Sequence, residues 1–226
     1  MDWTAFLLSL RLAAWTTALL IPFGIVIGRA LAWRRFAGKA WVEALVALPL
    51  VLPPTVLGYY LLVAMGVNSP VGNLYEALVG GPLVFSFAGL LVASVFINIP
   101  FAVQPLQRGF EAIAPEIREA AWCSGLSGWK TFLTIELPLA WPGLMSAAAL
   151  TFAHTIGEFG VVLMVGGSIP GETKTIAIAI YDRVQAFDHA AAAAMSATLL
   201  AFSLIAIGIA YALSRRVGRR TAAENG

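Results

Sequence analysis

Two polar side chains inside an apolar stretch have the residue types of a proton relay or an ion-binding site. His154 and Glu158 are four residues apart, so a helix places them on one face. Glu158 follows an uncharged run of 21 residues that begins at Leu137. Ionisable groups in such apolar surroundings usually face a cavity or a partner. The pair is therefore the first candidate for a functional polar site.

A third isolated charge, Arg11, interrupts the first apolar stretch. Its guanidinium could attract a dianion near the mouth of a membrane path, or it could pair with Asp2 or Glu158. If the apolar stretches line a path for anions, a carboxylate would add little to it, so we expect Glu158 to have a structural or gate-positioning role. Gly157 and Gly160 beside it indicate a helix break, where Glu158 could also bind backbone donors.

Residue combinations typical of enzymes are incomplete in this chain. His154 and Glu158 do not form an H-E-x-x-H motif, and a G-x-S-x-G elbow is missing. The stretch 125–131 has P-loop residue types without the spacing G-x-x-x-x-G-K-[ST]. The single cysteine, Cys123, excludes an internal disulfide and a cysteine-based zinc cluster. We expect no catalytic residue, no metal site and no ability to hydrolyse ATP alone.

The composition indicates that membrane-spanning helices position these residues. Of 226 residues, 60% are hydrophobic and 12% are charged, whereas soluble domains carry about 25% charge. A helix needs about 20 apolar residues to cross a bilayer. Five stretches are long enough: Ala5–Trp33, Trp41–Met65, Leu83–Val103, Leu137–Val165 and Ala190–Ser214. The sequence predicts one all-α integral membrane domain over residues 1–226, with five or six transmembrane helices.

The basic residues alternate between the connections. They follow the first, third and fifth stretches, at Arg34, Arg35, Lys39, Arg108, Arg118, Lys130, Arg215, Arg216, Arg219 and Arg220. The other connections hold only Lys174 and Arg183. The positive-inside rule therefore predicts an N-terminus outside and a C-terminus in the cytoplasm. A net charge of only +2 gives no indication of a nucleic-acid partner.

Three prolines lie near the middle of the second apolar stretch. Pro49, Pro53 and Pro54 each remove a backbone donor, so this span should be kinked or unwound there, next to Thr55. Freed carbonyls at that depth must face protein or water. The prolines are either a hinge beside a translocation path or a packing kink that a neighbouring helix satisfies.

The long connection after the third stretch predicts a helix, a turn and a second helix. Pro115 suits a first turn, Glu116 and Glu119 favour its positive end, and Gly125 can end it in a left-handed conformation. A helix of about ten residues is expected at the membrane surface, followed by a helical segment from Leu126 to Leu133. This arrangement favours docking of a soluble partner; the alternative is an interfacial helix without one.

The same connection resembles the EAA loop of ABC importer permeases. It matches the pattern E-A-A-x3-G-x9-I-x-L-P without a gap, at Glu119, Ala120, Ala121, Gly125, Ile135, Leu137 and Pro138. In that family the loop forms a coupling helix that inserts into a groove on the ATPase subunit. The resemblance implies a type I importer permease fold, with a coupling loop at about 108–137. It also implies that ATP and Mg²⁺ bind to a separate ATPase and that this chain binds no cofactor.

Further stretches resemble molybdate permeases, with sulfate permeases next. They are Ala47–Gly58, Asn98–Phe101, Ile156–Gly160, Gly167–Gly171 and Thr175–Tyr181. The resemblance implies a path for molybdate or tungstate, with Asn98 as another pathway or gate candidate, and sulfate stays an alternative. An ion-coupled secondary transporter is a weaker one, because we find no internal repeat.

The resemblance also implies partners and a location. They are a homodimer, two copies of an ABC ATPase, and a periplasmic or surface-tethered oxyanion-binding protein, in the cytoplasmic (inner) membrane. Within the outer connection, about 166–189, a short helix is expected to bury Ile176, Ile180, Val184 and Phe187. It either docks the binding protein or only covers the bundle.

Overall fold

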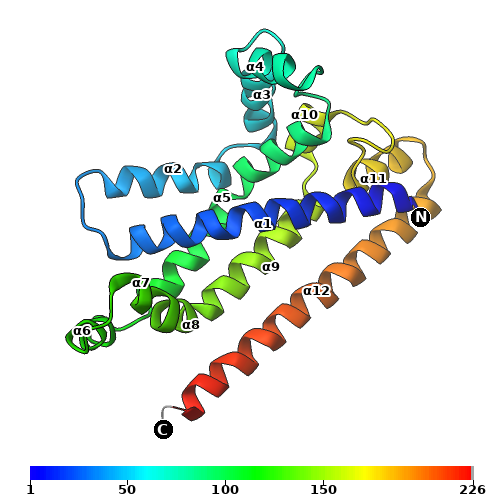
Figure 1. The fold of residues 1–226 in the computed structure, drawn as a ribbon. Helices are drawn as coiled ribbons and strands as arrows, with labels where there is room; N and C mark the ends of the chain where they lie inside the picture. The colour runs from blue at the N-terminus through cyan, green and yellow to red at the C-terminus, as the bar shows by residue number, and fades with distance from the viewer. Residues whose placement is uncertain (225–226) are drawn as a thin grey trace.

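The computed structural model describes residues 1–224, with side chains described for residues 1–208. The described chain is helical and contains no strand. Its long helices are α1 (Trp3–Trp33), α5 (Phe87–Glu111), α9 (Trp141–Gly157) and α12 (His189–Glu224). Helix α1 lies along α5 and α9, and α12 packs against α9 (Figure 1). The side chains of Arg215, Arg216, Arg219 and Arg220 lie outside the described part.

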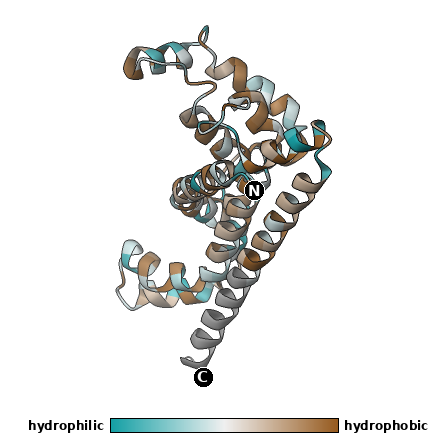
Figure 2. Ribbon diagram, turned by 90° about the vertical axis from the view of Figure 1, so that its right-hand side faces the viewer, coloured by the Kyte–Doolittle hydropathy of each residue, from teal (hydrophilic) through white to brown (hydrophobic). Residues whose placement is uncertain are grey.

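Shorter helices connect or extend these long ones. They are α2 (Lys39–Val51), α3 (Pro54–Met65), α4 (Pro70–Val79), α6 (Pro115–Cys123), α7 (Gly128–Thr131), the π-helical turn η1 (Phe132–Glu136), α8 (Leu137–Leu139), α10 (Gly160–Gly166) and α11 (Ile176–Gln185). Hydrophobic residues run along the long helices, and hydrophilic ones gather at the connections (Figure 2).

Three to five candidate spans lie within the described residues, and the upper number agrees with the five predicted from the sequence. Three helices are long and apolar enough to cross a membrane alone: Trp3–Trp33, Phe87–Glu111 and His189–Gly208. Two bent pairs raise the number to five within the described residues. They are Lys39–Val51 with Pro54–Met65, bent by 108°, and Gly128–Leu139 with Trp141–Gly157, bent by 68°. The bend of 108° in the second span is therefore much larger than the bend that a proline kink alone would cause.

The third span lies further along the chain than the predicted Leu83–Val103. It begins at Phe87 because the Ser86 hydroxyl caps it, accepting a hydrogen bond from Gly89 N at 3.2 Å. It then continues through Pro100 and Pro105 to Glu111. Arg108 is consequently part of the helix and not of the loop.

Close backbone approach holds α1, α5 and α9 together. A Cβ atom added to Gly28 of α1 would lie 2.9 Å from the backbone N of Gln107 on α5. One added to Gly143 of α9 would lie 2.7 Å from the carbonyl O of Pro105. Small residues at helix crossings are typical of membrane bundles, where packing rather than hydrophobic burial drives association.

The two outer connections each contain a short helix. Helix α4 was not predicted from the sequence; the Ser69 hydroxyl caps it by accepting from Gly72 N at 2.9 Å. Helix α11 lies within the predicted segment and buries Ile176 and partly Ile180 as predicted, but not Val184 and Phe187. Ile176, Ile178 and Ala179 are buried, whereas Phe187, predicted to be buried, is 82% exposed. Val184 is exposed as well, because α1, α9 and α12 cover only one side of α11.

Candidate functional site

The predicted surface helix is α6, and it ends in a glycine turn as expected. Pro115 occupies its first turn, and Gly125 has a φ of +81°. Gly125 N–H donates to the carbonyl of Trp122 at 2.9 Å, and Leu126 N–H donates to that of Ala121 at 3.1 Å. These two bonds form a Schellman motif, which uses glycine because its left-handed conformation is unfavourable for residues with a Cβ.

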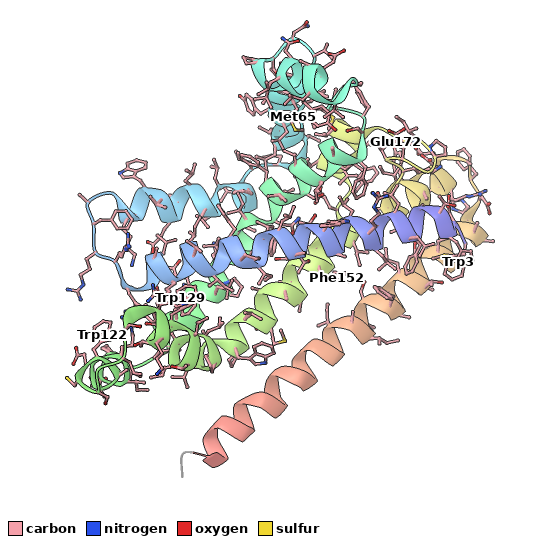
Figure 3. All side chains as sticks on the ribbon, in the orientation of Figure 1. Trp3, Met65, Trp122, Trp129, Phe152 and Glu172 are labelled. Atoms are coloured by element: carbon pink, nitrogen blue, oxygen red, sulfur yellow. The ribbon has the colours of Figure 1, made fainter. Side chains whose placement is uncertain are left out.

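The surface of this segment carries apolar side chains on the outside. Ile117, Trp122 and Trp129 are all exposed, Trp129 by 70%. Figure 3 shows Trp122 and Trp129 at the α6–α7 end of the molecule, far from Trp3. Around them Glu119, Ala120 and Gly125 are exposed, whereas Ala121 is buried. An exposed apolar surface of this kind typically marks an interaction site.

The chain after Gly125 returns to the bundle through a π-helical turn. The predicted helical segment 126–133 is α7 followed by the start of η1. In η1 the backbone N–H of Leu137 bonds to the carbonyl of Phe132, five residues earlier. Ile135 and Leu137 are half-buried and Pro138 is exposed. We call α6 to α8 (residues 115–139) the coupling segment, after the EAA loop that its sequence resembles.

A buried carboxylate that sequence analysis missed lies at the end of η1. The side chain of Glu136 has no exposed surface and binds two arginines. Arg29 Nε of α1 donates to its Oε2 at 2.6 Å, and Arg118 Nε of α6 donates to its Oε1 at 3.0 Å. Its signal in the sequence was a lone acidic residue at the variable position of the I-x-L-P pattern.

Aromatic rings surround the two arginines. The guanidinium of Arg118 lies 3.6 Å from the ring centroid of Trp33 and 4.9 Å from that of Trp122. Beside them is an open groove of about 850 Å³ between α1 and the coupling segment. Its walls include Arg29, Trp33, Arg118, Trp122 and Phe132.

The second candidate region is the contact between α3 and α10, where two broken helices meet. Helix α2 ends at Val51 and α3 begins at Pro54, with Pro53 as its cap, so the predicted break is confirmed. Pro49, in contrast, stays inside α2 and breaks nothing. Thr55, in the first turn of α3, is exposed.

The second break lies between α9 and α10. Glu158 ends α9, and its Oε1 accepts a hydrogen bond from the backbone N–H of Val161 at 3.0 Å. This is one of the two partners expected for Glu158. Its burial, with 8% exposed, keeps this carboxylate inside the protein at the start of α10.

Glycines bring the two breaks into contact. A Cβ on Gly160 of α10 would lie 2.7 Å from Pro54 Cβ, and one on Gly58 of α3 would lie 2.8 Å from Met164 Cβ. Helices α3 and α10 therefore approach each other more closely than larger residues would allow. Figure 1 shows them side by side at one end of α5.

A polar chain links this region to α5. Asn98 is fully buried, and its Nδ2 donates to the Ser94 carbonyl at 2.8 Å. His154 Nδ1 lies 3.0 Å from Asn98 Oδ1, and its Nε2 lies 3.9 Å from Glu158 Oε2. The Phe101 ring stacks on His154, with centroids 4.1 Å apart. The structure thus brings two predicted residues, Asn98 and Glu158, to opposite sides of His154.

Arg11 lies apart from these groups, and its expected ion pairs are wrong. Its guanidinium lies 4.2 Å from the ring centroid of Phe87. Asp2 instead caps α1 by accepting from Ala5 N at 3.0 Å, and Glu158 binds Val161 and His154. Arg11 is exposed on α1.

Comparisons with known proteins agree with this fold. The chain is 50% identical over 215 residues to the molybdenum transport system permease protein ModB of Azotobacter vinelandii, covering 95% of each chain. It is 35% identical over 198 residues to the sulfate transport system permease protein CysT of Escherichia coli, covering 88% of this chain and 71% of that one.

A solved structure shares the fold. The bacterial alginate ABC transporter in complex with an alginate pentasaccharide-bound periplasmic protein matches with a TM-score of 0.75 and 17% identity, over 95% of this chain and 78% of its own. The predicted ABC importer permease fold is thereby confirmed. A family model, described as binding-protein-dependent transport system inner membrane component, matches residues 21–219. The chain belongs to this family of multi-pass inner-membrane permeases.

Proposed function

We propose that this chain is the permease subunit of an ABC importer that takes up molybdate. The observation that carries the proposal is the coupling segment. An exposed helix with an E-A-A sequence ends in a left-handed glycine and presents Ile117, Trp122 and Trp129 to solvent. Identity to a molybdenum permease over 95% of both chains supports molybdate as the substrate.

The coupling segment would bind an ABC ATPase, which hydrolyses ATP. In this proposal ATP and Mg²⁺ bind to the ATPase, and the permease binds no cofactor. One coupling segment per chain serves one ATPase, so a complex with two ATPase copies needs two permeases. A homodimer with closed two-fold symmetry is the commonest solution to this requirement.

The distribution of charge supports an N-terminus outside and a C-terminus in the cytoplasm. The C-terminal ends of α1 and α5 lie on the side of the molecule that holds α6 to α8 (Figure 1). Arg34 and Arg35 directly follow α1, and Arg108 is in the last turn of α5. At the other end, Lys174 pairs with Asp182 at 2.6 Å and Arg183 pairs with Asp188 at 3.3 Å. The positive-inside rule counts Lys and Arg in the connections, and more of them lie at the coupling end, so we propose that this end faces the cytoplasm.

At the outer end, a periplasmic or surface-tethered binding protein would deliver the oxyanion. A relative of the same fold forms a complex with a ligand-bound periplasmic protein. The described spans offer few fixed positive charges, so we propose that the path itself binds a dianion weakly. Selection among molybdate, tungstate and sulfate then depends on the delivery protein.

The test is uptake by the complete complex in proteoliposomes. The permease is reconstituted with its ATPase and its binding protein, and ATP hydrolysis and oxyanion uptake are measured with molybdate, tungstate or sulfate. We expect molybdate to stimulate both. Stimulation by sulfate alone would assign the chain to the sulfate alternative, and uptake without ATP would indicate an ion-coupled transporter instead.

A further inference from the structure

The ion cluster Arg29–Glu136–Arg118, in which only the carboxylate is fully buried, connects three elements that must move together in a permease of the proposed kind. Arg29 belongs to the membrane helix α1, Arg118 to the surface helix α6, and Glu136 to the turn η1 that leads into α8 and α9. One carboxylate therefore joins the surface helix to two membrane spans. Its two oxygens are both used, and its side chain is fully buried.

Few other contacts would pass a displacement of α6 to the bundle. Helix α6 packs mainly against its neighbour α7 rather than against a long membrane helix. The groove of about 850 Å³ leaves space between α1 and the coupling segment. Long side chains bridge this space: Arg118 reaches both Glu136 and the ring of Trp33, the last residue of α1.

The chemistry of the cluster suits transmission of force more than simple stability. Arg29 engages both carboxylate oxygens, at 2.6 and 3.3 Å, and such a forked pair fixes orientation as well as distance. Apolar contacts alone would let α6 slide over α1. A buried ion pair is in general weak evidence for stability. Its specific geometry is better suited to fixing the position of one helix relative to another. The π-helical turn that carries Glu136 is a feature frequently found at functional sites.

We propose that this cluster is the joint through which movement of α6 reaches α1 and α9, with Glu136 as its positioning residue. The inference rests on the proposed function, because it assumes that an ATPase moves α6. It adds a second connection besides the covalent chain. Without the ion cluster, α6 still binds the ATPase, but a smaller part of its movement reaches α1 and α9.

The test compares Glu136→Gln with the parent in the reconstituted complex. ATP hydrolysis and molybdate uptake are measured in the same vesicles, and their ratio is the readout. Loss of the joint raises the ATP hydrolysed per molybdate by about fivefold or more, the range of conformational coupling energies. Glu43→Gln is the matched control, because Glu43 is partly exposed on α2 and pairs with Lys39 at 3.7 Å. Its Oε1 also accepts from Gln107 Nε2 of α5 at 2.8 Å, a bond that Gln can still accept, so the ratio stays at the parent value.

An unchanged ratio, with both activities lowered in proportion, overturns the proposal and leaves Glu136 a structural residue only. If Glu136→Gln does not assemble, Arg29→Lys decides, since it keeps the charge but removes the forked contact with both oxygens of Glu136. A raised ratio in this variant supports the joint, and a parental ratio contradicts it. If the parent complex itself takes up no molybdate, the proposed function fails, and that result is independent of the variants.

Discussion

The coupling segment and the α3–α10 contact are held in place by opposite means. The coupling segment is attached to α1 through long side chains, because Glu136 binds both Arg29 and Arg118. The second rests on direct contact, where Gly160 meets Pro54 without a side chain between them. The ion cluster therefore ties the coupling segment to α1 through side chains alone, whereas α3 and α10 are in direct contact near their backbones.

This difference predicts different outcomes for substitutions in the two regions. Removing one partner from a fully buried ion pair generally costs about 3–5 kcal/mol, and we expect less in this cluster because the Arg29 side chain is 36% exposed. Forcing a methyl group into a close contact costs about 1–3 kcal/mol through overpacking. In the coupling segment we expect changes in coupling, and at the α3–α10 contact changes in the transport step itself.

The largest effect is expected from Gly125→Asp in the coupling segment. A residue with a Cβ at a φ of +81° is strained by about 1–2 kcal/mol. A Cβ there meets nothing within 4 Å in this chain, so the permease should still fold. We expect uptake to fall by about 100-fold or more, since the turn and the charge disturb ATPase docking. Uptake in proteoliposomes measures this.

The matched control is Gly80→Asp at the end of α4. Gly80 has a φ of +83° and an equally open surrounding, so it carries the same backbone strain at the opposite end. It should transport like the parent. Equal losses in the two variants would mean that backbone strain, and not the position in the coupling segment, is responsible.

A smaller effect is expected from Trp129→Ala. Exposed tryptophans at interfaces are often hot spots worth about 2 kcal/mol or more, which is about 30-fold in affinity. We expect the ATPase to dissociate more readily from this variant in a titration with purified subunits. Trp41→Ala on α2, where the side chain is 82% exposed, should leave the affinity unchanged. If both variants bind the ATPase equally well, Trp129 lies outside the interface.

For the α3–α10 contact, Gly160→Ala is expected to slow uptake by about tenfold, consistent with about 1–3 kcal/mol of overpacking. The added Cβ would lie 2.7 Å from Pro54 Cβ, part of a rigid ring that cannot swing aside. Gly157→Ala, three residues earlier, meets nothing within 4 Å and should behave like the parent. Both variants should still bind the ATPase. If Gly160→Ala takes up molybdate at the parental rate, close contact between α3 and α10 is not needed for transport.

The sequence predicted the features that depend on a few neighbouring residues. Pro115 and Gly125 define the ends of α6, and Pro53 with Pro54 breaks the second span, because proline and glycine act on their own backbone. Even so, the 108° bend between α2 and α3 exceeds what the prolines alone indicate.

The features that were missed depend on distant residues. Glu136 binds Arg29, which lies 107 positions away in the sequence. The π-helical turn that carries Glu136 could not be predicted from the local sequence. The buried face of α11 is chosen by α1, α9 and α12, so Val184 and Phe187 were assigned to the wrong side. The sequence did indicate His154 as a polar residue within an apolar stretch, but its bond to Asn98 on α5 could not be predicted from their spacing.

The smallest effect is expected from the double variant Pro53→Ala, Pro54→Ala. Alanines restore two backbone donors between Val51 and Thr55, so the break should become more helical and the 108° bend less favourable. The contact of Pro54 with Gly160 opposes this straightening, because it holds α3 against α10. We expect a shift between access states of about 1–3 kcal/mol at most, with normal assembly, uptake slowed by about fivefold, and altered basal ATP hydrolysis.

Labelling of single cysteines at Thr55 and Leu57 measures that shift directly. Thr55 is exposed and Leu57 is half-buried in the first turn of α3, so a moving α3 changes the reactivity at Leu57 more than at Thr55. In the parent complex, nucleotide should change the labelling, and in the double variant this change should be smaller. Labelling that is the same with and without ATP at both positions, together with parental uptake by the double variant, would mean that the prolines form a static packing kink. The coupling segment would then be the sole moving part of the two regions compared.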